Sequence, residues 1–238
     1  MYAILCTVVL TIILFSDIIN RKELSFYDGG VTVAGAKHSE SYRMIAEAVR
    51  KKTAEIPLLT DEIEDALKRE KHQACFFTGH RDIVGRDAND TERLQEALRG
   101  WLDRQVESMV YQGFSTFLCG GARGFDLLAA ASVLQAKQLY HPSLRLILLL
   151  PCREQTRGWN ERDLALHLAV LQRAEAYYLQ QDYDRSCMHR RNRLLVDCAI
   201  TGVAYYDEKK ERSGTGMTVR YAVGCGLPMV FMPSGETE

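Results

Sequence analysis

Short apolar runs alternate, from residue 74 onward, with stretches in which apolar residues recur at helical spacing. The runs predict strands at 74–78, 115–119, 144–150, 176–179, 200–206 and 228–232. The stretches between them predict helices near 90–111, 124–139, 160–173, 186–198 and 216–224. Such alternation is typical of a parallel sheet with helices on both faces. We therefore predict an α/β fold over residues 72–238, a Rossmann-like three-layer α/β/α domain with a mostly parallel sheet of about six strands.

Residues 1–71 are predicted to form an N-terminal extension. Its apolar segment, residues 2–19, contains Ser16 and Asp17, and the unbroken run before them is shorter than the roughly 18 residues of a membrane-spanning helix. A buried strand, a non-native extension and a membrane anchor all stay open as interpretations. If the segment inserts, Arg21 and Lys22 would keep the rest of the chain inside the cell. Helices are predicted next at 40–54 and after Thr60, which is placed to cap the second one.

Composition and charge limit the function classes. A hydrophobic content of 47% is enough for a packed core, and the formal net charge of -1 gives no bulk attraction to nucleic acid. The seven cysteines include no Cys-x-x-Cys pair, which predicts free thiols in a reducing, cytoplasmic compartment and no structural zinc. The oligomeric state stays open, with a homo-oligomer among the alternatives.

The turn after the second predicted strand is the strongest candidate for a ligand site, because ligands of parallel α/β sheets bind beyond the carboxyl ends of the strands. It contains Gly120, Gly121 and Gly124, and Asp126 follows in the first turn of the next helix. Bare backbone amides and a helix N-terminus favour a bound phosphate. The turn matches neither the G-x-G-x-x-G fingerprint nor the P-loop. The alternative is a tight turn that needs small residues for packing.

A second glycine-bearing turn, with Ser213, Gly214 and Thr215, leads into the last predicted helix. Two such turns in one sheet predict a phosphate site that they share at the carboxyl edge. On this interpretation Gly120→Glu is expected to abolish nucleotide binding and to leave the fold nearly unchanged.

Further candidates are polar or glycine positions that follow the strands. They are Thr78, Gly79, Arg81, Arg123, Arg153, Gln155, Trp159, Arg191 and Asn192. Arginine can bind phosphate through two N–H groups, and an indole can stack on a base. The alternatives are a Trp159 that packs the next helix on the sheet and a solvated arginine face at 190–193. His80 is expected at the surface or at a cap.

Four motifs occur in order between residues 74 and 232. They are Phe76-Phe77-Thr78-Gly79-His80-Arg81, Gly120-Gly121-Ala122-Arg123-Gly124-Phe125-Asp126, Arg191-Asn192-Arg193 with Asp197, and Ser213-Gly214-Thr215 with residues 218–222. Together they resemble the YpsA-type branch of the SLOG superfamily, which also includes the DprA/Smf and LOG proteins. The resemblance implies a Rossmann-like domain that binds a nucleotide or a nucleotide-derived ligand such as ADP-ribose or NAD. It also implies that the two glycine turns form opposite walls of the ligand site, with 78–81 at the end of the first strand.

We therefore predict a ligand-binding or sensing protein whose partner is a phosphate-bearing small molecule. One alternative is a LOG-like phosphoribohydrolase drawing on Arg81, Asp126 and Arg191. The LOG enzymes carry a glutamate where this chain has residues 218–220, so the resemblance puts that reaction in doubt. The other alternative is single-stranded DNA binding of the DprA kind, against which the neutral charge and the few aromatic residues argue.

Overall fold

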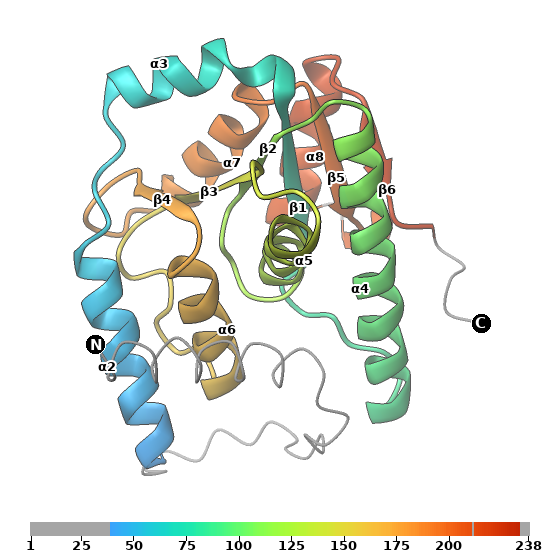
Figure 1. Cartoon of the computed structure of the whole chain (residues 1–238). Helices are drawn as coiled ribbons and strands as arrows, with labels where there is room; N and C mark the ends of the chain where they lie inside the picture. The colour runs from blue at the N-terminus through green and yellow to red at the C-terminus, as the bar shows by residue number, and fades with distance from the viewer. Residues whose placement is uncertain (1–38, 211, 234–238) are drawn as a thin grey trace.

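Six parallel strands form one sheet at the centre of the computed structural model, which describes residues 39–210 and 212–233 (Figure 1). The strands are β1 (Ala74–Gly79), β2 (Thr116–Cys119), β3 (Arg145–Leu150), β4 (Glu175–Tyr178), β5 (Thr201–Tyr205) and β6 (Met229–Phe231). Their order across the sheet is β4-β3-β2-β1-β5-β6, and every pairing is parallel. The Rossmann-like α/β prediction is confirmed.

Helices cover both faces of the sheet (Figure 1). One layer holds α4 (Ala88–Tyr111), α5 (Phe125–Leu139) and α6 (Glu161–Leu171), and the other holds α3 (Asp61–Arg69), α7 (Cys187–Asp197) and α8 (Gly214–Gly224). The last helix begins two residues before the predicted start at 216. The reason is a cap, because the Ser213 side chain accepts a hydrogen bond from the amide of Gly216 at 3.0 Å.

The core lies on both sides of β1, whose apolar run is buried throughout. Cys75 and Phe77 pack with the α4–α6 layer, whereas Phe76 packs with the α7–α8 layer. All three side chains are fully buried. Burying one phenylalanine contributes about 1.5–3 kcal/mol, so this strand is firmly fixed between the layers. Its carboxyl end, and the residues that follow it, therefore have a fixed position at the sheet edge.

Residues before β1 cover the outer edge of the sheet. The helix α2 (Glu40–Ala54) packs against α6, as Figure 1 shows. Leu58 then pairs in parallel with Tyr178 of β4, and Leu59 donates to the Tyr178 carbonyl at 2.8 Å. Thr60 caps α3, as predicted. This segment protects an edge strand that would otherwise present unpaired backbone groups.

The apolar segment at 2–19 lies outside the described residues, so all three interpretations of it stay open. Within residues 39–210 and 212–233, no helix is long and apolar enough to cross a membrane.

Candidate ligand-binding site

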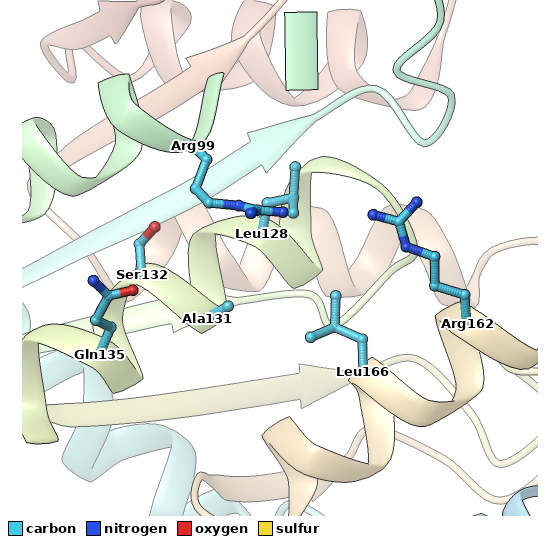
Figure 2. A pocket seen from close by; sticks show the side chains of 7 residues that line it. All are labelled: Arg99, Leu128, Ala131, Ser132, Gln135, Arg162 and Leu166. Atoms are coloured by element: carbon cyan, nitrogen blue, oxygen red, sulfur yellow. The ribbon is translucent and has the colours of Figure 1, made fainter. Parts of the chain in front are cut away.

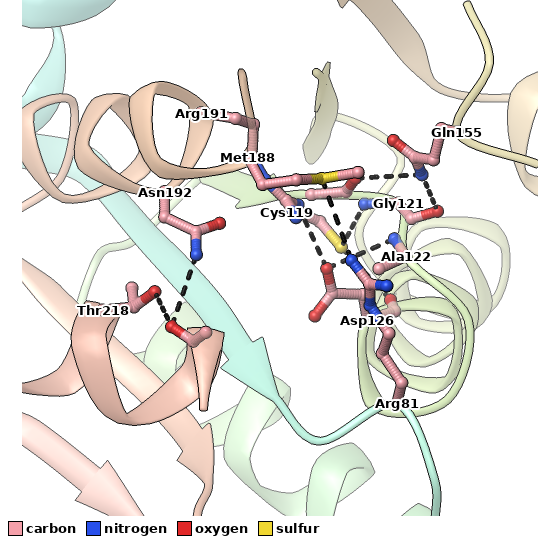
Figure 3. Close-up of polar contacts among 12 residues, drawn as sticks. Arg81, Cys119, Gly121, Ala122, Asp126, Gln155, Met188, Arg191, Asn192 and Thr218 are labelled. Atoms are coloured by element: carbon pink, nitrogen blue, oxygen red, sulfur yellow. Dashed lines mark hydrogen bonds and ion pairs between the residues drawn. The ribbon is translucent and has the colours of Figure 1, made fainter. Parts of the chain in front are cut away.

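The strand order of the sheet changes direction between β1 and β5. The chain runs outward from β1 through β2 and β3 to β4, and then returns to the other side of β1 at β5. In open α/β sheets, ligands bind outside the carboxyl ends of the strands at this reversal. The turns after β1, β2 and β5 reach this edge, and the first turns of α7 and α8 lie beside it (Figure 3).

A buried ion pair fills the space above Gly120 in the turn after β2. The Nη1 atom of Arg191, from α7, lies 3.3 Å from Oδ2 of Asp126, and both side chains are less than a tenth exposed. A Cβ atom on Gly120 would lie 1.0 Å from that Nη1 atom and 2.7 Å from Asp126 Oδ2. Glycine at this position therefore lets the arginine of a distant helix approach the turn.

The charged groups at this turn are shielded from solvent. Burial raises the pKa of Asp126, and the Arg191 charge and the Ala122 amide oppose that rise. Burial also raises the pKa of the neighbouring Cys119 thiol. Its Sγ atom donates to the carbonyl of Asp126 at 3.2 Å, so Cys119 is a neutral part of the turn.

Backbone amides of this turn bond within the protein. Gly121 donates to Cys119 Sγ at 3.5 Å, Ala122 to Asp126 Oδ2 at 3.3 Å, and Phe125 to the carbonyl of His80 at 3.2 Å. The expectation that the amides of this turn are bare does not hold for these three. The effect of Gly120→Glu on the fold stays a prediction, and the new side chain would meet the flexible end of Arg191.

The N-terminus of α8 is open by comparison. Gly214 is exposed, and the atom nearest to the position of a Cβ on it is Nδ2 of Asn192 at 3.9 Å. The carbonyl of Gly214 accepts from Asn192 Nδ2 at 3.4 Å and from Thr218 Oγ1 at 2.9 Å. These contacts orient the first turn of the helix and leave the space in front of Gly214 accessible.

The first turns of α7 join the two glycine-bearing turns (Figure 3). Arg191 contacts the Gly120 turn, and the next residue, Asn192, contacts Gly214. Arg81, which follows β1, reaches the same helix, since its Nη2 atom lies 3.8 Å from Sδ of Met188. Segments that follow three different strands therefore meet at one helix, and the two turns lie on either side of it.

Polar atoms with incomplete bonding gather around the Gly120–Gly121 turn. The buried side-chain atoms without a hydrogen-bond partner among the described residues are Gln155 Oε1, His167 Nδ1, Gln180 Oε1 and Arg191 Nε. Three of these four belong to side chains that flank the turn, since Gln155 Nε2 donates to the Gly121 carbonyl at 2.6 Å and His167 lies against Gly121. An unpaired buried polar group costs about 1–3 kcal/mol, and such groups are rare in native proteins.

Two residues of the loop after β3 have structural contacts that differ from the predicted ligand role. Arg153 donates to the carbonyls of Thr53 and Ile56 at the end of α2, and its guanidinium lies 5.0 Å from the ring centre of Tyr178. Arg153 thus holds α2 against β4. Trp159 packs edge-on against the ring of His167 at 5.2 Å, which matches the packing alternative.

The remaining predicted residues differ in their burial and contacts at the carboxyl edge of the sheet. Thr78 and Thr215 are buried. A Cβ on Gly79 would lie 2.3 Å from the ring of Phe125, so this glycine makes room for the core. Arg123 pairs with Asp82 at 2.9 Å.

His80 is more important to this edge than its sequence position indicates. It is 7% exposed, where the surface or a cap was expected. Its Nε2 atom accepts from the amide of Asp207 at 2.9 Å, and its own amide donates to the carbonyl of Tyr205 at 3.3 Å. The histidine therefore fastens the end of β1 to the end of β5. A Thr-Gly-His sequence at the carboxyl end of a buried strand is the local signal for it.

The model of the YpsA family, described as the YspA SLOG family, matches residues 75–222, which is more than half of the chain. The chain belongs to this family. The YpsA match begins within β1 and ends within α8, so it includes every turn that meets at α7.

Related proteins cover the YpsA region at low identity. A UPF0398 protein of Halalkalibacterium halodurans is 29% identical over 114 residues, which are 47% of this chain and 60% of that protein. One from Listeria monocytogenes is 24% identical over 148 residues, 59% of this chain and 78% of that protein. The match thus spans less than two thirds of the first relative and more of the second.

Among solved structures, DNA processing protein A from Helicobacter pylori, described for its single-stranded DNA binding mode, is similar with a TM-score of 0.47. Its identity is 16%, over 71% of this chain and 68% of that one. DNA processing protein A from Streptococcus pneumoniae is similar with a TM-score of 0.44 and 15% identity, over 71% of this chain and 52% of that one.

Proposed function

We propose that this chain binds a nucleotide or a nucleotide-derived small molecule, with the phosphate at the N-terminus of α8. The observation that supports this most is the meeting of the two glycine turns at consecutive residues of α7. Arg191 contacts the Gly120 turn and Asn192 contacts Gly214. Membership of a SLOG family agrees with a nucleotide-related role.

The chemistry at α8 suits a phosphate. The first N–H groups of a helix have no partner within the helix, and the helix dipole favours negative charge there. Ser213 accepts from the amide of Gly216, and the amides of Gly214 and Thr215, at the start of the same helix, would be the donors to the ligand. Asn192 Nδ2 and the exposed Arg81 supply further donors on the same side.

The Gly120–Gly121 turn would face the remainder of the ligand. Arg191 is buried, and its Nε atom has no hydrogen-bond partner among the described residues, so a ligand at this turn would complete its bonding. The ligand class includes AMP, ADP-ribose and NAD. The free, mostly buried cysteines among the described residues agree with a reducing, cytoplasmic setting in which such nucleotides occur.

The hydrolase alternative relied on Asp126, whose carboxylate is buried and paired with Arg191. In this arrangement Asp126 supports the turn, which favours binding without turnover. Chromatography for free base after incubation with AMP tests the alternative.

Substitution of Gly214 gives the sharpest test of the proposal. Gly214 has space for a side chain and does not adopt a positive φ, so Gly214→Asp is expected to fold. An aspartate at the first position of a helix stabilises it by about 0.3–1 kcal/mol, but its charge repels a phosphate. Thermal-shift screening of AMP, ADP-ribose and NAD identifies the probe, and calorimetric titration follows.

Gly214→Ala is the matched control, because it adds the Cβ atom without the charge. We expect affinity in the alanine variant within about threefold of wild type, and at least about tenfold weaker binding, or about 1.4 kcal/mol, in the aspartate variant. Equal affinity in the two variants would show that the phosphate does not bind at the N-terminus of α8, and it would refute the proposal.

A further inference from the structure

A separate pocket lies between α4, α5 and α6, in the helical layer on one face of the sheet (Figure 2). Arg99 comes from α4, and Arg162 and Leu166 come from α6. The wall from α5 consists of Leu128, Ala131, Ser132 and Gln135, whose spacing places them on one face of that helix. The space is about 410 Å³, its open mouth included.

Positively charged, polar and apolar side chains line this pocket. Figure 2 shows the guanidinium groups of Arg99 and Arg162 directed toward the space between them. Leu128, Ala131 and Leu166 supply an apolar floor. Ser132 and Gln135 add a hydroxyl and an amide, and none of the described lining residues carries a carboxylate.

The two arginines repel each other. Burial lowers the pKa of Arg99, and the charge of Arg162 lowers it further. Asp103 and Glu96 raise that pKa, each by less than Arg162 lowers it. Three helices thus place two positive charges at one pocket, where an anion would be attracted to both guanidinium groups.

We propose that this pocket binds a small dianion, such as inorganic phosphate or a short dicarboxylate, between Arg99 and Arg162. Each planar guanidinium can donate two hydrogen bonds to one oxyanion group. Ser132 and Gln135 complete the donor set. The site shares no lining residue with the α8 site.

The experiment separates this pocket from α8 by using Gly214→Asp as the background protein. This protein is titrated calorimetrically with inorganic phosphate and, separately, with succinate, at low ionic strength because salt screens these charges. The same titrations are repeated after adding Arg162→Gln or Arg99→Gln. Arg50→Gln is the matched control, since Arg50 lies on α2 with a side chain that is 74% exposed.

We expect saturable binding of at least one of the two anions in the background protein and in the Arg50 control. Either arginine substitution in the pocket should weaken it at least about tenfold. Arg162 is exposed, so its variant is expected to fold even if Arg99→Gln destabilises the protein. Binding of phosphate alone, or of succinate alone, supports the proposal and identifies the chemical class.

Absence of saturable binding of both anions overturns the proposal. So does binding that neither substitution weakens. These outcomes do not depend on whether nucleotides bind at α8, so failure of one proposal is distinguishable from failure of the other.

Discussion

Gly120→Ala tests whether the approach of α7 to the turn after β2 depends on the missing side chain. The new Cβ atom would lie 1.0 Å from Arg191 Nη1, so the guanidinium must move. The end of an arginine is flexible, and the steric cost itself is small. Moving the guanidinium, however, breaks its contact with Asp126 and leaves a carboxylate that is 7% exposed without its counter-charge.

The expected loss of unfolding free energy follows from the loss of the Arg191–Asp126 ion pair. Breaking a buried ion pair by removing one partner costs about 3–5 kcal/mol, and a hydrogen bond to a charged group contributes about 1.5–3 kcal/mol. Arg191 would stay nearby, and Asp126 can take up a proton, so we expect a loss of about 2–3 kcal/mol, which is less than the cost of removing one partner. For a chain of this size that lowers Tm by about 5–10 °C.

Urea unfolding of wild type, Gly120→Ala, Arg191→Ala and the double variant forms a thermodynamic cycle. If the alanine acts by displacing the guanidinium, Gly120→Ala should cost almost nothing once Arg191 is removed, with a coupling energy of about 2 kcal/mol. Additive effects of the two substitutions would refute this reasoning. They would show that the turn tolerates or rejects a side chain independently of α7.

Two further predictions concern stability. Burial lowers the pKa of His167 to about 4, below the unfolded value, so its neutral form is required in the fold and stability falls as pH drops from about 6.5 toward 4. Because of this residue, the unfolding free energy of the wild type should be about 2 kcal/mol lower at pH 5 than at pH 7. If His167→Gln loses as much stability as the wild type between these two pH values, the assignment to His167 is contradicted. Gly124 has a φ of 78°, and a Cβ on it would meet the carbonyl oxygen of Arg81 at 2.1 Å, whereas Gly158 has a φ of 76° and open space. Urea unfolding should therefore show a loss of about 1–2 kcal/mol for Gly158→Ala and a clearly larger one for Gly124→Ala, and similar losses would count against the clash.

The elements of the fold were predictable because their signals are local. The apolar run of β3 is buried on both faces, which such a run indicates by itself. Thr60 was recognisable as a cap from neighbouring residues. The helix α8 begins two residues before its predicted start because glycines after a serine are typical of a loop, whereas here Ser213 caps a helix that begins at Gly214.

Contacts at the site were less predictable because they join distant parts of the chain. Arg191 and Asp126 are 65 positions apart, and Arg153 and Thr53 are 100 apart. No local pattern shows that one arginine would rest on Gly120 while the other holds α2. The sequence therefore predicted that both turns lie at the carboxyl edge of the sheet, but it could not distinguish the filled turn at Gly120 from the open one at Gly214.

A two-dimensional ¹H–¹⁵N NMR titration with AMP tests the central claim most directly, with ADP-ribose replacing AMP if the thermal-shift screen prefers it. We predict the largest shifts at the backbone amides of Gly214 and Thr215, at the side-chain amide of Asn192 and at Nε–H of Arg191. Saturable binding that leaves these four signals unchanged would contradict the account, because a nucleotide whose phosphate lies at α8 and whose remainder faces the Gly120–Gly121 turn must alter them.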